Sequence, residues 1–267
     1  MNLSNRVKDR IIGLDGNIGM YFYDIKKDMS CFVGNCDKFI SMGIAKLLVA
    51  VEVIHQAQTG SIDLDAEFIL PKVHHYGIPE SKYEETVGIL DFFHPGMRLT
   101  IEDLLRAMVV ISDNYAFNAL LELVTPQEVN KTARRLGMSD TTVGSFIYDG
   151  NISVDRPENC HSVREIGNLL ELIYRRQLIS HAASEKLLRL LSYHQRRDTM
   201  SYFQRHGMSV AQMTGFDTTF CHEAAIVLAD TPFIFVMSVS GLDNRVADQV
   251  IRDVSILCLD SARNPLI

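Results

Sequence analysis

Residues 98–124 constrain the fold of this chain most, because they predict two buried helices joined by a short polar turn. Thr100 followed by Asp103 has the form of a capping box, in which side chains satisfy the first free amides of a helix. The helix that follows has apolar residues at the spacing of one buried face: Ile101, Leu104, Leu105 and Met108. A second helix ends before Pro126. The turn between them, 112–114, is therefore a rigid place from which to present side chains.

Ser112, Asp113 and Asn114 form this turn, and three polar residues between apolar helices are costly unless they are satisfied or used. One interpretation is an ordinary helix–helix turn capped by Ser112 or Asp113. The wider context reads Met-Val-Val-Ile-Ser-Asp-Asn-x-Ala-x-Asn-x-Leu-Leu-x-Leu-Val. This stretch resembles the second of three motifs in class A β-lactamases and penicillin-binding serine hydrolases. The other two motifs decide between the interpretations.

Strand-like runs lie at both ends of the chain, and helical patterns lie between them. The strands are expected at 18–24, 30–34, 209–214, 221–229 and 233–239. Helices are expected at 43–58, 162–175 and 182–193, with a closing helix at 246–259. We therefore predict an α+β fold, in which both termini form one antiparallel sheet flanked by helices around a central all-helical lobe. The β-lactamase and transpeptidase resemblance implies the same layout. We expect one domain, 1–267, with a sheet lobe near 1–42 and 207–267 and a helical lobe near 43–206.

The first motif of the family is Ser-x-x-Lys, in which the serine is the acylated nucleophile and the lysine helps to take its proton. The matching stretch is Phe-Ile-Ser-Met-Gly-Ile-Ala-Lys, which ends at Lys46. Lys46 is in place, but Gly43 stands at the position of the nucleophile. Ser41 is a poor substitute, since five residues rotate a helix by about 140° and remove it from the face of Lys46. We interpret Lys46 as a cleft residue retained by ancestry or ligand contact.

The third motif, Lys-Thr-Gly on an inner strand, resembles Met213, Thr214 and Gly215, so methionine replaces the cation that helps to hold the substrate carboxylate. The next strand has no arginine that would obviously compensate. The deacylating carboxylate of a Glu-x-x-Leu-Asn pattern has no match between 141 and 159, where Asp149 and Glu158 are the carboxylates of interest.

The resemblance thus implies two groups of site residues. The candidate catalytic positions are Gly43, Lys46, Ser112 and Asn114, and the candidate substrate-binding positions are Met213, Thr214 and Gly215.

Three departures at separate places predict that β-lactam hydrolysis has been lost, since removal of the nucleophile of a serine hydrolase costs on the order of 10⁶ in turnover. The chain would then be a ligand-binding or regulatory pseudoenzyme. The alternative is an active hydrolase that uses Ser112 as nucleophile beside Lys46, a Ser–Lys pair. In both cases Lys46, Ser112, Asn114 and Thr214 should converge on one cleft.

The composition of the chain limits the kinds of partner and the cellular compartment that we expect. The net charge is −7 and no basic stripe is present, so nucleic acid is not expected as a partner. No apolar run approaches membrane-spanning length, and the N-terminus lacks a signal-peptide core. The five cysteines show no zinc spacing and favour reduced thiols in the cytoplasm.

Neither a metal site nor a cofactor is expected, because His74, His75 and His94 have no ligating pattern. A small molecule in the cleft is the expected partner, and His222 is interpreted as a satisfied strand histidine rather than a general base.

Overall fold

The computed structural model describes residues 2–71, 87–147, 158–196 and 199–264. The chain divides into two compact units. The sheet unit comprises Met1–Ile44 and Cys160–Ile267, and the helical unit comprises Ala45–Asn159. The middle of the chain therefore forms one unit, and its two ends together form the other.

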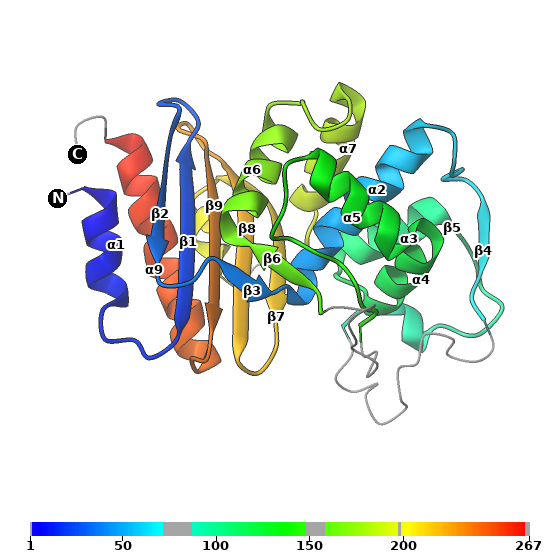
Figure 1. The fold of residues 1–267 in the computed structure, drawn as a ribbon, viewed down its shortest axis with the longest axis horizontal. Helices are drawn as coiled ribbons and strands as arrows, with labels where there is room; N and C mark the ends of the chain where they lie inside the picture. The colour runs from blue at the N-terminus through cyan, green and yellow to red at the C-terminus, as the bar shows by residue number, and fades with distance from the viewer. Residues whose placement is uncertain (1, 72–86, 148–157, 197–198, 265–267) are drawn as a thin grey trace. The chain divides into compact units, whose positions relative to one another are not determined.

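Five antiparallel strands form the main sheet of the sheet unit, in the order β2-β1-β9-β8-β7 (Figure 1). The strands are β1 (Asn17–Asp24), β2 (Met29–Gly34), β7 (Ser209–Phe216), β8 (Phe220–Leu228) and β9 (Phe233–Ser240). The central pairing joins the two ends of the chain, since Met20 of β1 lies opposite Met237 of β9. The predicted antiparallel sheet built by both termini is confirmed.

One face of this sheet packs against α9 (Asn244–Arg263), with α1 (Leu3–Ile11) and the short α8 (Ser201–Arg205) beside it. The apolar core between these elements contains alternate residues of β1 and β9, such as Met20 and Phe235. The sequence did not predict α1, because only Leu3 and Val7 of that helix are buried and two positions make no periodic pattern.

The opposite face carries α6 (Val163–Tyr174), and α7 (His181–Ser192) packs on the edge strand β7. A two-stranded ribbon of β3 (Lys38–Ile40) and β6 (Cys160–Ser162) also belongs to this unit. The short helical turn η1 (Met42–Ile44) follows β3. The predicted lobe boundaries therefore need correction: 160–206 groups with the sheet and not with the helical lobe, because α6 and α7 bury their apolar faces on strands.

The helical unit is built around α2 (Ala45–Gln58), which contacts α3 (Ile101–Val110), α4 (Asn114–Val124) and α5 (Pro126–Arg135). Every residue from 45 to 54 is buried, as expected of a helix surrounded by others. The capping box of Thr100 and Asp103 is present as predicted. β4 (Glu67–Ile69) pairs with β5 (Arg98–Thr100), and the turn η3 spans Leu90–Phe92. No helix in the described ranges is long and apolar enough to cross a membrane.

Candidate functional site

Gly43 lies in η1, directly against the main chain of β7. A Cβ atom built at this position would lie under 3.0 Å from the carbonyl oxygen of Thr214, closer than real Cβ atoms come to a neighbour. Gly215 has the same property, since its Cβ would crowd the carbonyl oxygen of Ser41 and the ring of His222. The two glycines allow the backbones of η1 and β7 to approach closely. The space in which a side chain at position 43 would begin is thus filled by a main-chain carbonyl group.

The residues next to Gly43 present no exposed hydroxyl group. Ser41 is fully buried, so its hydroxyl group does not face solvent. Met42 has a φ of 45°, a left-handed conformation that a side chain rarely adopts. Strained backbone of this kind clusters at functional sites. The turn therefore has a strained backbone, but Gly43 itself has no side chain that could react.

Lys46 is fully buried at the start of α2 and is held by the Ser112–Asn114 turn of the same unit. Its Nζ atom donates to the carbonyl oxygen of Ser112 at 2.7 Å, to Ser112 Oγ at 2.9 Å and to Asn114 Oδ1 at 2.7 Å. Burial lowers the pKa of Lys46 to about 7, and the nearby Asp113 carboxylate opposes this shift. The structure therefore brings three predicted site residues together: Lys46, Ser112 and Asn114.

Asp113, between the two lysine partners, has a structural role. Its Oδ1 atom accepts from the Ala116 amide at 2.8 Å and caps α4. Its Oδ2 atom accepts from the amides of Ile89 and Leu90 at 2.7 and 3.0 Å. Both interpretations of the turn therefore apply, since Asp113 caps the helix while Ser112 and Asn114 bind Lys46. Ser112 has a φ of 58°, so this turn is strained as well.

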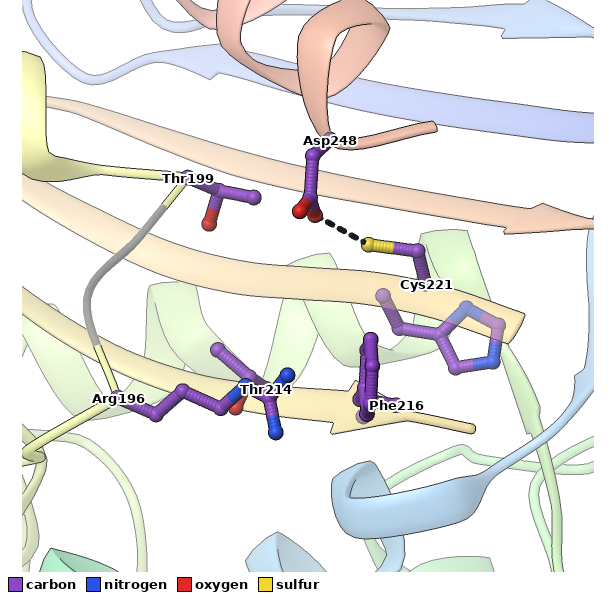
Figure 2. Close-up of a pocket in the computed structure, with 8 residues that line it drawn as sticks. Arg196, Thr199, Thr214, Phe216, Cys221 and Asp248 are labelled. Atoms are coloured by element: carbon purple, nitrogen blue, oxygen red, sulfur yellow. Dashed lines mark hydrogen bonds between the residues drawn. The ribbon is translucent and has the colours of Figure 1, made fainter. Parts of the chain in front are cut away.

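The edge strand β7 contributes Thr214 to a pocket in the sheet unit (Figure 2). Thr214 Oγ1 lies 3.2 Å from His194 Nε2. Met213 is fully buried and offers no contact to solvent. The pocket contains a cation that sequence reasoning missed: the Arg196 guanidinium group lies 3.8 Å above the ring centroid of Phe216. Arg196 lies in the segment after α7 and precedes β7, whereas the expectation of a compensating arginine concerned the strand that follows β7.

Cys221 also lines this pocket, and its thiol is held by a carboxylate. Its Sγ atom donates to Asp248 Oδ1 at 3.1 Å, which Figure 2 marks with a dashed line. Burial, together with the Asp248 carboxylate, raises the pKa of the Cys221 thiol. The thiol is therefore protonated at neutral pH.

Some of the predictions from the sequence are not tested by these contacts. Lys46, Ser112 and Asn114 belong to the helical unit and Gly43, Met213, Thr214 and Gly215 to the sheet unit, so their convergence on one cleft stays a prediction. Asp149, His74 and His75 lie outside the described residues. Among the residues that are described, no three His, Cys, Asp or Glu side chains are arranged to hold a metal ion.

A sheet made by both chain ends, a helical unit between them, Ser-Asp-Asn at the start of α4 and Thr-Gly on an edge strand define the class of the serine β-lactamases and penicillin-binding hydrolases. Within this class, the chain belongs to the β-lactamase enzyme family, whose model matches residues 2–262.

Solved structures of the class have the same fold. A β-lactamase from Chitinophaga pinensis DSM 2588 superposes with a TM-score of 0.87 at 21% identity, over 98% of this chain and 100% of that one. A β-lactamase from Sphaerobacter thermophilus DSM 20745 gives 0.85 at 20% identity, over 97% and 96%. PBP-A gives 0.84 at 19% identity, over 98% and 96%. A search of the curated proteins found no match.

Proposed function

We propose that this chain is a ligand-binding or regulatory pseudoenzyme of the β-lactamase family that does not form an acyl-enzyme at position 43. The observation that carries the proposal is the contact between η1 and β7. Gly43 has no side chain to acylate, and the Thr214 carbonyl oxygen fills the space where one would begin. A single reversion to serine therefore restores neither the hydroxyl group in its position nor the room for a substrate carbonyl beside it.

The ligand of the proposed site is a small molecule that carries an anionic group. Arg196 supports this choice, because its guanidinium group is positioned by stacking on Phe216 and shares a pocket with Thr214. A guanidinium group binds carboxylates in a bidentate manner, and a threonine hydroxyl group can add a hydrogen bond. Arg196 would thus supply the charge that Met213 lacks.

The first test treats the protein with benzylpenicillin and measures its intact mass. We expect no covalent adduct on the unmodified protein, and an adduct would overturn the non-acylating proposal.

A second test follows the reversible binding of benzylpenicillin by ligand-observed NMR. Arg196→Gln should weaken binding roughly tenfold or more, the amount that a lost charged hydrogen bond typically costs. Arg189→Gln is the matched control, since Arg189 is exposed on α7 and does not line the pocket. Equal binding by both variants would contradict the role of Arg196.

A second candidate function is hydrolysis with Ser112 as nucleophile, and the geometry around Lys46 favours it specifically. A neutral Lys46 amine can donate its two protons to the Ser112 carbonyl oxygen and Asn114 Oδ1, and accept the proton of the Ser112 hydroxyl group. Because burial lowers the pKa of Lys46 to about 7, a large share of the molecules holds this neutral amine at physiological pH. Ser112 would then be activated by a base 2.9 Å away.

A fluorophosphonate probe separates the two candidates, because it labels activated serines covalently. The second candidate expects one adduct, which Ser112→Ala abolishes and which increases as pH rises through 7. Ser41→Ala is the matched control, since Ser41 is buried and lies in the stretch that matches the first motif. No adduct on the wild-type protein would reject Ser112 as a nucleophile and leave the pseudoenzyme.

We also propose that the protein works in a reducing compartment, the cytoplasm. In support, none of the five cysteines, all within the described residues, forms a disulfide, and Cys221 and Cys258 are buried. Thiol titration of protein purified from its native host without reductant should count five thiols in denaturant. A count of three or fewer would contradict this location.

A further inference from the structure

Two buried histidines fasten the β3–β6 ribbon to the main sheet. His161 of β6 lies with its Nε2 atom 2.8 Å from Ser238 Oγ on β9. His222 of β8 donates from Nε2 to the carbonyl oxygen of Ile40 on β3 at 3.0 Å. One bond therefore runs from each ribbon strand to the sheet. The ribbon leads into η1, so these bonds also position the turn that contains Gly43.

The two imidazole rings lie against each other and against one aromatic side chain. Their ring centroids are 5.1 Å apart, and Phe39 lies 6.1 Å from His161 and 5.7 Å from His222. Burial lowers the pKa of His222 to about 4, and the carbonyl groups of Ile40 and Cys221 partly oppose it. Burial and the charge of His222 lower the pKa of His161 well below its usual range. Both rings are therefore neutral at pH 7.

No carboxylate of the described residues contributes to the pKa shift of either ring. β7 and β9 carry no titratable side chain, and η1 carries none. Cys221 and Glu223 neighbour His222 in β8 and therefore point to the other face of the sheet. Glu165, half-buried in the first turn of α6, is not among the causes of either pKa shift, and other charged groups of the ribbon and of α6 are exposed or have partners of their own. Lys38 is exposed, Asp37 accepts from Ser162 Oγ at 2.8 Å, Arg164 stacks on Phe32 at 4.0 Å, and Glu171 pairs with Arg175 at 2.8 Å.

The positive charge of a protonated ring would consequently be buried, with no negative charge shown to stabilise it. His161 Nδ1 is buried and has no hydrogen-bond partner among the described residues. A charge at this place also repels a second charge on the ring 5.1 Å away. The protonated rings are stable only when the ribbon leaves the sheet and water reaches them.

We propose that His161 and His222 form an acid-sensitive clamp, which holds the β3–β6 ribbon and the Gly43 turn on the sheet at neutral pH and releases them on acidification. A histidine exposed by opening has a pKa of about 6.5. Below that pH, the opening equilibrium constant rises roughly tenfold per pH unit for each histidine that gains a proton only when open. The clamp concerns local opening in the sheet unit and is independent of whether the protein binds or hydrolyses a ligand.

Amide hydrogen exchange of the whole protein, corrected for the pH dependence of the intrinsic rate, tests the clamp. Between pH 7 and pH 5, protection of the ribbon amides should fall several hundredfold, because each of the two clamp histidines contributes roughly 25-fold. Protection in the centre of the sheet, at the pairing of β1 with β9, should fall less. Loss of protection by the same factor in the ribbon and in β1 would indicate global acid unfolding and overturn the proposal, as would a ribbon that exchanges equally at both pH values.

A variant isolates one of the two protons. His222→Asn keeps a side-chain donor for Ile40 but does not titrate, so the pH-dependent loss of ribbon protection should shrink to roughly 25-fold. His206→Asn, at an exposed histidine beyond α8, should keep the wild-type dependence. An unchanged dependence in His222→Asn would overturn the clamp. If this variant does not fold, imidazole NMR titration of the wild-type protein decides: both rings should resist protonation down to pH 5, and two rings that titrate near pH 6.5 in the folded state would contradict the proposal.

Discussion

Gly43 shows what a single residue can and cannot reveal from sequence. Its place three residues before Lys46 was enough to predict a missing nucleophile, because the motif is local. Its packing against the Thr214 carbonyl oxygen could not be predicted, since that contact joins residues that are far apart in the chain. The same reason hid Arg196, which is adjacent to Phe216 only in the folded protein. Lys46, Ser112 and Asn114 could be named as candidates because each lies in a recognisable stretch, and the structure shows that they contact one another.

Adding a side chain at position 43 should destabilise the protein whether or not it carries a hydroxyl group. We expect Gly43→Ala and Gly43→Ser to lower the free energy of unfolding by a similar amount, about 1–3 kcal/mol, because both carry the Cβ atom that meets Thr214. Urea unfolding midpoints measure this. A Gly43→Ser variant of wild-type stability that also acquires a penicillin adduct would show that β7 yields readily and that the loss of acylation is a matter of one residue.

Asp113 should contribute more to stability than the ordinary cap at Asp103. It accepts three main-chain amides from two segments, with all of these bonds buried or half-buried. Asp113→Ala should cost at least about 1.5–3 kcal/mol, the range for one hydrogen bond to a charged group. Asp103→Ala, the matched control in an exposed capping box, should cost about 1 kcal/mol. Thermal unfolding of both variants provides the comparison, and equal costs would contradict the anchoring role of Asp113.

At the scale of elements, the strongly periodic segments were predicted with ends within a few residues of the observed ones. The strands of the main sheet and the helices α2, α3, α4, α6, α7 and α9 belong to this group. The elements that were not predicted are short or polar, such as β3 with β6, β4 with β5, α1 and α8. Three-residue strands carry no readable pattern, and their pairing partners lie far away in the sequence. Their structure therefore comes from tertiary contacts rather than from local preference.

The packing of α6 on the sheet depends on a residue that no periodicity identifies. A Cβ atom at Gly167 would lie under 3.0 Å from ring atoms of Tyr21 in β1, so the glycine lets helix and strand approach closely. Gly167→Ala should lower the free energy of unfolding by about 1–3 kcal/mol, although alanine has a better helix propensity than glycine. In a double-mutant cycle, Tyr21→Leu should reduce this cost by 0.5 kcal/mol or more, the coupling typical of residues in contact. If the losses of free energy of unfolding in the two single variants simply add in the double variant, Gly167 does not make room for Tyr21.

At the scale of the whole molecule, the topology separates local from distant contacts. The helical unit is one continuous stretch of chain, whereas the sheet unit needs strands from both ends. The sequence predicted this division in outline from the order of strand-like and helical patterns. It misplaced 160–206, because a helix that covers a sheet and a helix that covers other helices have the same amphipathic period.

This topology also predicts an order of folding. Met20 pairs with Met237, so β1 and β9 close a loop of more than 200 residues, while α3 and α4 are joined by a turn of a few residues. Closing long loops costs chain entropy before contacts compensate for it, and folding slows as contacts become more distant in sequence. During refolding from urea, pulsed hydrogen exchange with mass spectrometry should find the amides of α2 to α5 protected before those of β1 and β9. Simultaneous protection of both groups would show that the helical unit needs the sheet in order to fold, and that the discontinuous unit limits the rate for the whole chain.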